Sequence, residues 1–91
     1  MLEIPEEQII KGLKFICTCE ACPEQYAVFD GNKEVGYVRL RWGNLRVYYP
    51  NSEGLLIYEK AFKDGFKSGF DDKKERKYYL NKIADQLSIK K

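Results

Sequence analysis

Residues 25–49 read QYAVFDGNKEVGYVRLRWGNLRVYY. Two tight-turn sequences, DGNK at residues 30–33 and WGNL at residues 42–45, divide this stretch into three segments rich in apolar residues. Gly and Asn tolerate the positive φ angles that two-residue hairpin turns require. The stretch therefore predicts three antiparallel strands joined by two hairpins, and we expect the other elements to pack against them.

The second turn fixes a register if Gly43 and Asn44 form its two-residue loop. Because side chains alternate along a strand, this register predicts one apolar face and one face rich in Arg and Tyr. The apolar face would carry Val38, Leu40, Trp42, Leu45, Val47 and Tyr49. The opposite face would carry Tyr37, Arg39, Arg41, Arg46 and Tyr48. A shift of one residue would bury the arginines, so the choice of faces is strongly specified.

Shorter elements are predicted on either side of these strands. Residues 5–11, PEEQIIK, predict a short N-terminal helix, because Pro suits the first helical position and acidic residues favour the N-terminal end. Residues 13–18 predict an edge strand, and residues 55–58 a further strand. A short helical turn is expected at residues 59–63, followed by a loop that packs Phe66 and Phe70 on the core.

The end of the chain predicts an α-helix. Asp72 and Glu75 have the spacing of a capping box, with Asp72 as the N-cap. The apolar residues that follow at helical spacing are Tyr79, Leu80, Ile83, Ala84 and Leu87. The sequence thus predicts an α+β fold, in which an antiparallel meander of three to five strands packs on a C-terminal α-helix, with a short N-terminal helix.

Composition limits the classes of protein to consider. A chain of 91 residues fits one domain, residues 1–91. The net charge of +2 requires no acidic partner, so any basic site must be local. No apolar run approaches the length of a transmembrane helix, and Glu3, Glu6 and Glu7 lie where a signal peptide would be basic. We therefore expect a cytoplasmic protein with no membrane partner.

Cys17, Cys19 and Cys22 lie within six residues and form a candidate metal site. Thiolates bind zinc, but a tetrahedral site needs a fourth ligand, and the chain has no His and no fourth Cys. Glu20, Glu24 or a second chain would have to supply that ligand. The alternative is that the thiols are reduced and packed at the edge of the sheet, since free Cys behaves as a small hydrophobic residue. No other cofactor is expected.

The Arg and Tyr residues of the polar face, listed above, form the candidate binding site. Arg binds phosphates, and Tyr rings provide surfaces on which bases stack. In the predicted register Arg41 lies opposite Arg46, and like charges that face each other across strands are destabilising. The alternative is a solvated outer face on which Asp30, Glu34 or Glu59 neutralises the arginines.

No catalytic motif is present, and the absence of His excludes Ser-His and Cys-His arrangements. We therefore expect a non-enzymatic binding module for an anionic partner, with single-stranded nucleic acid as the sharpest version. Two alternatives stay open. One is a protein–protein adaptor or homodimer that pairs through an edge strand or through the aromatic residues of 58–70, and the other is a zinc-stabilised domain. The oligomeric state is not predicted.

Several short segments between residues 24 and 89 resemble a small uncharacterised domain associated with prophages and mobile elements of Gram-positive bacteria. They are EQYAVF at 24–29, VGYVRLR at 35–41, RV at 46–47 with YP at 49–50, IYE at 57–59, ER at 75–76 and YLNK at 79–82. The family has no established activity, so the resemblance implies only a phage-related setting in which small proteins often bind a partner. Trp42 stands where the family pattern has a polar residue or His, and the resemblance therefore implies no ligand role for this position.

Overall fold

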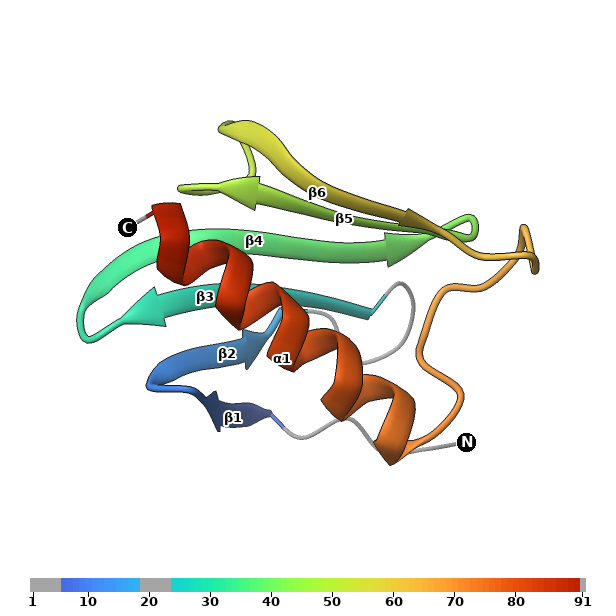
Figure 1. The fold of residues 1–91 in the computed structure, drawn as a ribbon, viewed down its shortest axis with the longest axis horizontal. Helices are drawn as coiled ribbons and strands as arrows, with labels where there is room; N and C mark the ends of the chain where they lie inside the picture. Colours follow the sequence, from blue (N-terminus) through green and yellow to red (C-terminus); the bar gives the residue numbers. More distant parts are fainter. Residues whose placement is uncertain (1–5, 19–23, 91) are drawn as a thin grey trace.

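The computed structural model describes residues 6–18 and 24–90. Within these ranges, six strands form one antiparallel sheet in chain order, and helix α1 follows them (Figure 1). The elements are β1 (Glu7–Ile10), β2 (Leu13–Cys17), β3 (Glu24–Asp30), β4 (Lys33–Arg41), β5 (Asn44–Tyr49), β6 (Leu55–Ala61) and α1 (Lys73–Lys90). This arrangement confirms the predicted α+β class with an antiparallel meander and a C-terminal helix, although the sheet has six strands instead of three to five.

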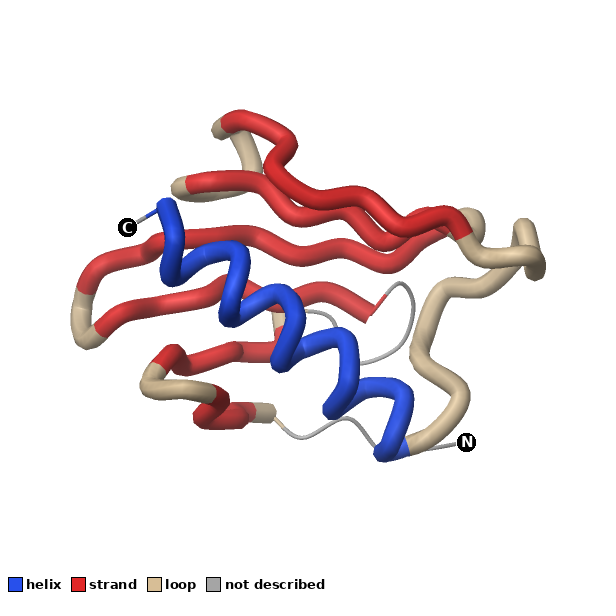
Figure 2. The backbone as a smooth tube through the Cα atoms, viewed as in Figure 1, coloured by secondary structure: helices blue, strands red, loops and turns tan. Residues whose placement is uncertain are grey.

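Helix α1 runs diagonally across one face of the sheet, from β1 at one side to β5 and β6 at the other (Figure 2). The sheet residues that it covers form the core. They are Leu13, Phe15, Tyr26, Val28, Val35, Val38, Leu40, Leu45 and Val47, all at most 1% exposed. Gly36 allows the helix to approach closely, because a Cβ there would lie 2.7 Å from Cδ1 of Leu87. No described element covers the opposite face of the sheet.

The helix begins as the sequence predicts. The backbone N–H of Glu75 donates to Oδ1 of Asp72 at 2.8 Å, and Oε1 of Glu75 accepts from the N–H of Asp71 at 2.7 Å. Leu80, Ile83, Ala84 and Leu87 are fully buried and Tyr79 packs at the edge of the core, as expected from their spacing. Within the described part of the chain, no helix is both long enough and apolar enough to span a membrane.

A buried carboxylate ties the helix to the sheet. Glu24, at the start of β3, is 1% exposed, and its Oε2 accepts a hydrogen bond from Nε of Arg76 at 2.7 Å. Its Oε1 accepts from Nη2 of Arg76 at 3.3 Å and from the N–H of Phe70 at 3.1 Å, and the Tyr26 hydroxyl donates to Oε2. One side chain thereby holds together β3, the segment before the helix and the first turns of α1.

The predicted N-terminal helix is wrong. Residues 7–10 form β1 instead, which pairs with β2 through a turn at Lys11 and Gly12, both at positive φ. This turn makes Ile10 the partner of Leu13, and it allows Ile10 to pack against the core from a strand. The segment at 13–17 is consequently an inner strand, and β1 is the edge.

The predicted turn and register between β4 and β5 are also wrong by one position on each strand. The loop is Trp42-Gly43, so that Leu40 pairs with Leu45 and Arg41 with Asn44. Because both strands shift together, the two faces keep their predicted residues, except that Trp42 leaves the apolar face and Tyr49 lies only at the margin of the core.

The region after residue 55 differs from the prediction in two ways. Strand β6 extends to Ala61, where a helical turn was expected, because Glu59 and Ala61 pair with Arg46 and Asn44 on β5. Phe70 reaches the core as expected, but Phe66 is 80% exposed.

Replacing Glu24 with Ala is expected to lower the free energy of unfolding by about 3–5 kcal/mol, because Arg76 would stay charged in a buried position without a counter-ion. Urea unfolding followed by circular dichroism measures this loss. Glu59→Ala removes an exposed ion pair instead, and this control should cost at most about 1 kcal/mol. Equal effects of the two substitutions would contradict the central role of Glu24.

Candidate anion-binding face of the sheet

The uncovered face of the sheet brings together all five residues of the predicted Arg/Tyr site. Tyr37 lies directly opposite Tyr48, and Arg39 directly opposite Arg46. Arg41 follows on the same face, next to the turn. The sequence predicted that two arginines face each other across the strands. In the structure Arg39 faces Arg46, whereas the predicted register placed Arg41 opposite Arg46.

The strand registers arrange this face in rows that cross the sheet. One row, which we call the aromatic row, consists of Ile16, Ala27, Tyr37, Tyr48 and Leu56. A second row, the arginine row, consists of Gln25, Arg39, Arg46 and Glu59. Cross-strand neighbours on one face lie about 4.5–5.5 Å apart, so each row is a continuous surface. The face therefore presents an apolar band beside a cationic one.

The two tyrosines of the aromatic row are fixed in place. Their ring centroids lie 6.2 Å apart with the planes tilted by 39°. The Tyr37 hydroxyl donates to Oε1 of Gln25 at 2.7 Å. Both rings are half-buried, so each keeps part of its surface accessible.

The three arginines differ in how they are neutralised. Nε of Arg46 lies 2.7 Å from Oε2 of Glu59, and this hydrogen bond, together with the charge of Glu59, raises the pKa of Arg46. Among the described residues, no carboxylate oxygen lies within 4.0 Å of Arg39 or Arg41. Among the residues that the structure describes, an acidic neighbour thus forms an ion pair with Arg46, and none does so with Arg39 or Arg41.

A hollow of about 190 Å³ lies where the arginine row meets the β4–β5 turn. Its lining residues are Arg39, Arg41, Trp42, Asn44 and Arg46. The hollow is smaller than the roughly 300–1,000 Å³ of pockets that enclose a drug-sized ligand. It suits one anionic group of a larger ligand that continues across the face.

Two aromatic residues at the turn were assigned to the core from the sequence and are on the surface instead. Trp42 is 59% exposed and Phe66 is 80% exposed, with their ring centroids 6.2 Å apart. We call this pair the aromatic tip. Cζ of Arg41 lies 5.9 Å from the centre of the Trp42 ring, so the tip borders the arginines directly. One feature of the sequence indicates this placement. Two-residue hairpin loops commonly have Gly at their second position, so Gly43 is consistent with Trp42 as the first residue of the loop.

Backbone contacts hold the aromatic tip in position. The N–H of Gly43 donates to the carbonyl of Lys67 at 2.8 Å, and the N–H of Phe62 donates to the carbonyl of Gly43 at 2.7 Å. A Cβ at Gly43 would lie 2.7 Å from the carbonyl oxygen of Asp64, and its φ of 73° also favours glycine. The loop that carries Phe66 is therefore docked on the turn that carries Trp42.

The candidate zinc site falls largely outside the described residues. Cys17 lies at the end of β2, half-buried against the core, and Cys19 and Cys22 lie in the undescribed segment 19–23. Glu24 is committed to Arg76 and Tyr26, so it does not serve as the missing ligand in this structure. Within residues 6–18 and 24–90, no three His, Cys, Asp or Glu side chains are gathered to hold a metal ion.

No protein-family model, curated protein or solved structure matches this chain. The resemblance to a domain of prophages and mobile elements stays an expectation from the sequence.

Replacing Trp42 with Asn is expected to leave the free energy of unfolding unchanged or to raise it by about 1 kcal/mol. Trp42 has a φ of 52°, in the left-handed region, which costs a residue with a large side chain about 1–2 kcal/mol and which Asn tolerates. Chemical unfolding followed by circular dichroism measures the change, and Gly43→Ala is the matched destabilising control at the next position. A large loss of stability in Trp42→Asn would show that Trp42 serves the fold.

Proposed function

We propose that this chain binds single-stranded nucleic acid across the uncovered face of its sheet, as a non-enzymatic module of the cytoplasm. The observation that carries the proposal is the placement of Arg39 and Arg41, both without a described carboxylate partner, between two pairs of accessible aromatic rings. Proteins that bind single strands combine these two elements, a cationic track for the phosphates and aromatic rings for the bases.

Each part of the face has a role in this proposal. Arg39 and Arg41 contact phosphates directly. Arg46 interacts both with Glu59 and with the phosphates of the nucleic acid. Tyr37 and Tyr48 stack on bases at one end of the site, and the aromatic tip stacks on bases at the other end. Stacking of a base on an aromatic side chain contributes about 1–3 kcal/mol, and it depends little on sequence.

The dimensions of the face suit an extended single strand. Tyr37 and Trp42 are five residues apart along β4 and its turn, which corresponds to roughly 17 Å at the rise of a strand. A single-stranded nucleic acid that spans this distance would place phosphates beside the arginine row and bases next to the aromatic rings at both ends. A duplex keeps its bases stacked on one another, so it would leave the exposed rings without a partner.

The like-charged pair Arg39–Arg46 also favours an anionic ligand. Two like charges that face each other across strands destabilise a sheet, and Glu59 offsets only one of them. A phosphate in the adjacent hollow would interact favourably with both guanidinium groups. An acidic protein partner could supply such charge, but it would not use the aromatic rings as stacking surfaces.

The only tryptophan of the chain lies in the proposed site, so its fluorescence reports binding directly. We expect oligo(dT) of about 12 nucleotides to quench Trp42 in low salt, a length within the site sizes of single-strand binding proteins. The variant Arg39→Glu/Arg41→Glu should weaken binding at least about tenfold and reduce the slope of log K against log salt by about 1.4, since each phosphate contact contributes about 0.7.

The matched control is Lys74→Glu/Lys82→Glu, which makes the same charge change on the exposed side of α1. This control should retain most of the affinity and of the salt dependence. Equal losses in the two double variants would show that only bulk charge matters. Absence of quenching at low salt, with the protein folded, would contradict the proposal.

A further inference from the structure

We propose that the edge of β1 and the adjoining side of α1 form a binding site for an extended acidic peptide, which adds to the sheet as a seventh strand. This site lies on a different part of the molecule from the nucleic-acid face and does not depend on it. Strand addition at a sheet edge, beside a helix, is a recurring way in which domains hold peptides.

The first observation is the direction of the main-chain groups of β1. The N–H of Cys17 donates to the carbonyl of Glu6 at 2.9 Å, and β1 pairs with β2 in the continuous register Gln8 to Phe15 and Ile10 to Leu13. In an antiparallel pair, residues whose N–H and C=O groups bond to the partner strand alternate with residues whose N–H and C=O groups point away from it. The N–H and C=O groups of Glu7 and Ile9 therefore point away from β2, toward the outer edge of the sheet that the structure describes.

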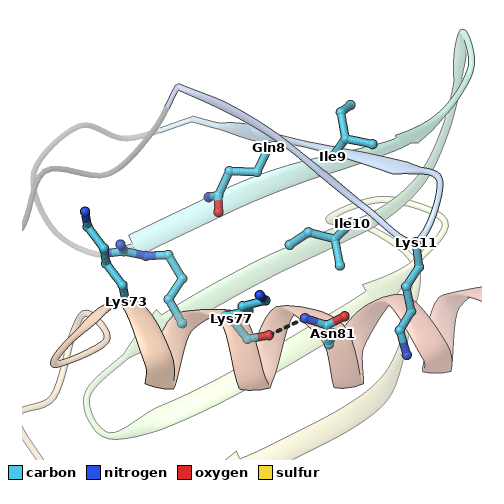
Figure 3. A pocket seen from close by; sticks show the side chains of 8 residues that line it. Gln8, Ile9, Ile10, Lys11, Lys73, Lys77 and Asn81 are labelled. Atoms are coloured by element: carbon cyan, nitrogen blue, oxygen red, sulfur yellow. Dashed lines mark hydrogen bonds between the residues drawn. The ribbon is translucent and has the colours of Figure 1, made fainter.

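The second observation is a groove beside this edge. A hollow of about 520 Å³ separates β1 from α1, within the range of sites that enclose a ligand. Figure 3 shows Gln8 and Ile10 reaching from β1 toward the helix, and Lys77 and Asn81 rising from the helix. We call this hollow the β1–α1 groove. It combines an apolar contribution from Ile10 with polar walls.

The third observation is the charge of the groove, which selects the occupant. Lys11 is held by Asp85 at 2.7 Å, and Arg76 is held by Glu24. Lys73 and Lys77 also line the groove and have no carboxylate within 4.0 Å in the described part of the chain. These two ammonium groups along one wall favour a segment with carboxylate side chains on that side.

The face of β1 that points away from the helix would contact the other side of the bound peptide. Ile9 is 65% exposed and points away from α1 in Figure 3. A strand paired with β1 would place alternate side chains next to Ile9 and next to the two lysines. The preferred peptide therefore alternates apolar and acidic residues. A second copy of this chain fits less well, because it would bring a second set of the same lysines to the site.

The test uses the full chain and blocked peptides of about ten residues, the upper length of common strands. One peptide alternates Val and Glu, and the comparison peptide alternates Val and Lys. Titration followed by amide NMR spectra should show that the Val/Glu peptide binds more tightly than the Val/Lys peptide, and that it slows hydrogen exchange at Glu7 and Ile9. The variant Lys73→Glu/Lys77→Glu should reverse the preference between the peptides.

The variant Ile9→Pro removes an outward-pointing N–H without removing a hydrogen bond to β2, a place where an edge strand accepts proline. It should weaken peptide binding at least about fivefold, whereas Ile9→Ala keeps the N–H and should weaken binding less. The Arg39→Glu/Arg41→Glu variant should bind the peptide normally, which separates this site from the nucleic-acid face.

Three results would overturn the proposal. The first is slow exchange at Glu7 and Ile9 in the protein without peptide, which would mean that the edge is already paired. The second is equal affinity of Ile9→Pro and the unchanged protein. The third is a dimer in light scattering that Ile9→Pro abolishes, which would identify a second copy as the occupant.

Discussion

The fold depends on one ion pair placed where water is excluded. A carboxylate and a guanidinium each lose several kcal/mol of hydration on burial, and only close pairing with all hydrogen bonds made can offset this loss. Glu24 and Arg76 meet this condition, because both carboxylate oxygens are bonded and the hydrogen bond to Glu24 raises the pKa of Arg76. Burial and the same carboxylate raise the pKa of the Tyr26 phenol, which therefore stays a hydrogen-bond donor. The pair determines where the helix begins relative to the sheet.

The position of the helix then determines which surfaces are left for binding. Because α1 crosses one face only, its apolar side completes the core, and the other face keeps its arginines and tyrosines in contact with solvent. The same diagonal path leaves the edge of β1 beside the start of the helix, where the β1–α1 groove lies. Lys67 is fixed near the start of the helix. Burial lowers its pKa, but hydrogen bonds to Asp71 and Glu75 raise the pKa by more, so that the ammonium group stays charged. Both candidate sites thus follow from one helix and its anchor.

The sequence predicted those parts of the structure that depend on local pattern. Alternation within β4 and β5 identified the two faces, and the spacing of Asp72 and Glu75 identified the start of the helix. The anchor was not predictable in this way, because Glu24 and Arg76 are 52 residues apart and their pairing leaves no local pattern in the sequence. The segment at 5–11 misled for a related reason: the adjacent Ile9 and Ile10 fit both a helix and a strand, and only pairing with β2 decides between them.

The register of the β4–β5 hairpin shows why the candidate site was only partly predicted. Gly43-Asn44 and Trp42-Gly43 both provide a loop with glycine, and an apolar Trp favours the choice that buries it. The structure takes the other choice, since Gly43 must lie against the backbone of Asp64 and Gly65, where no Cβ fits. This choice places Trp42 in an unfavourable backbone conformation and in water, next to arginines that face each other across the sheet. Each of these features costs stability, and each lies on the same small area of surface. Local costs gathered in one place are typical of a functional site, and the proposed ligand, with phosphates and flat rings, would offset the charge repulsion and cover the exposed ring.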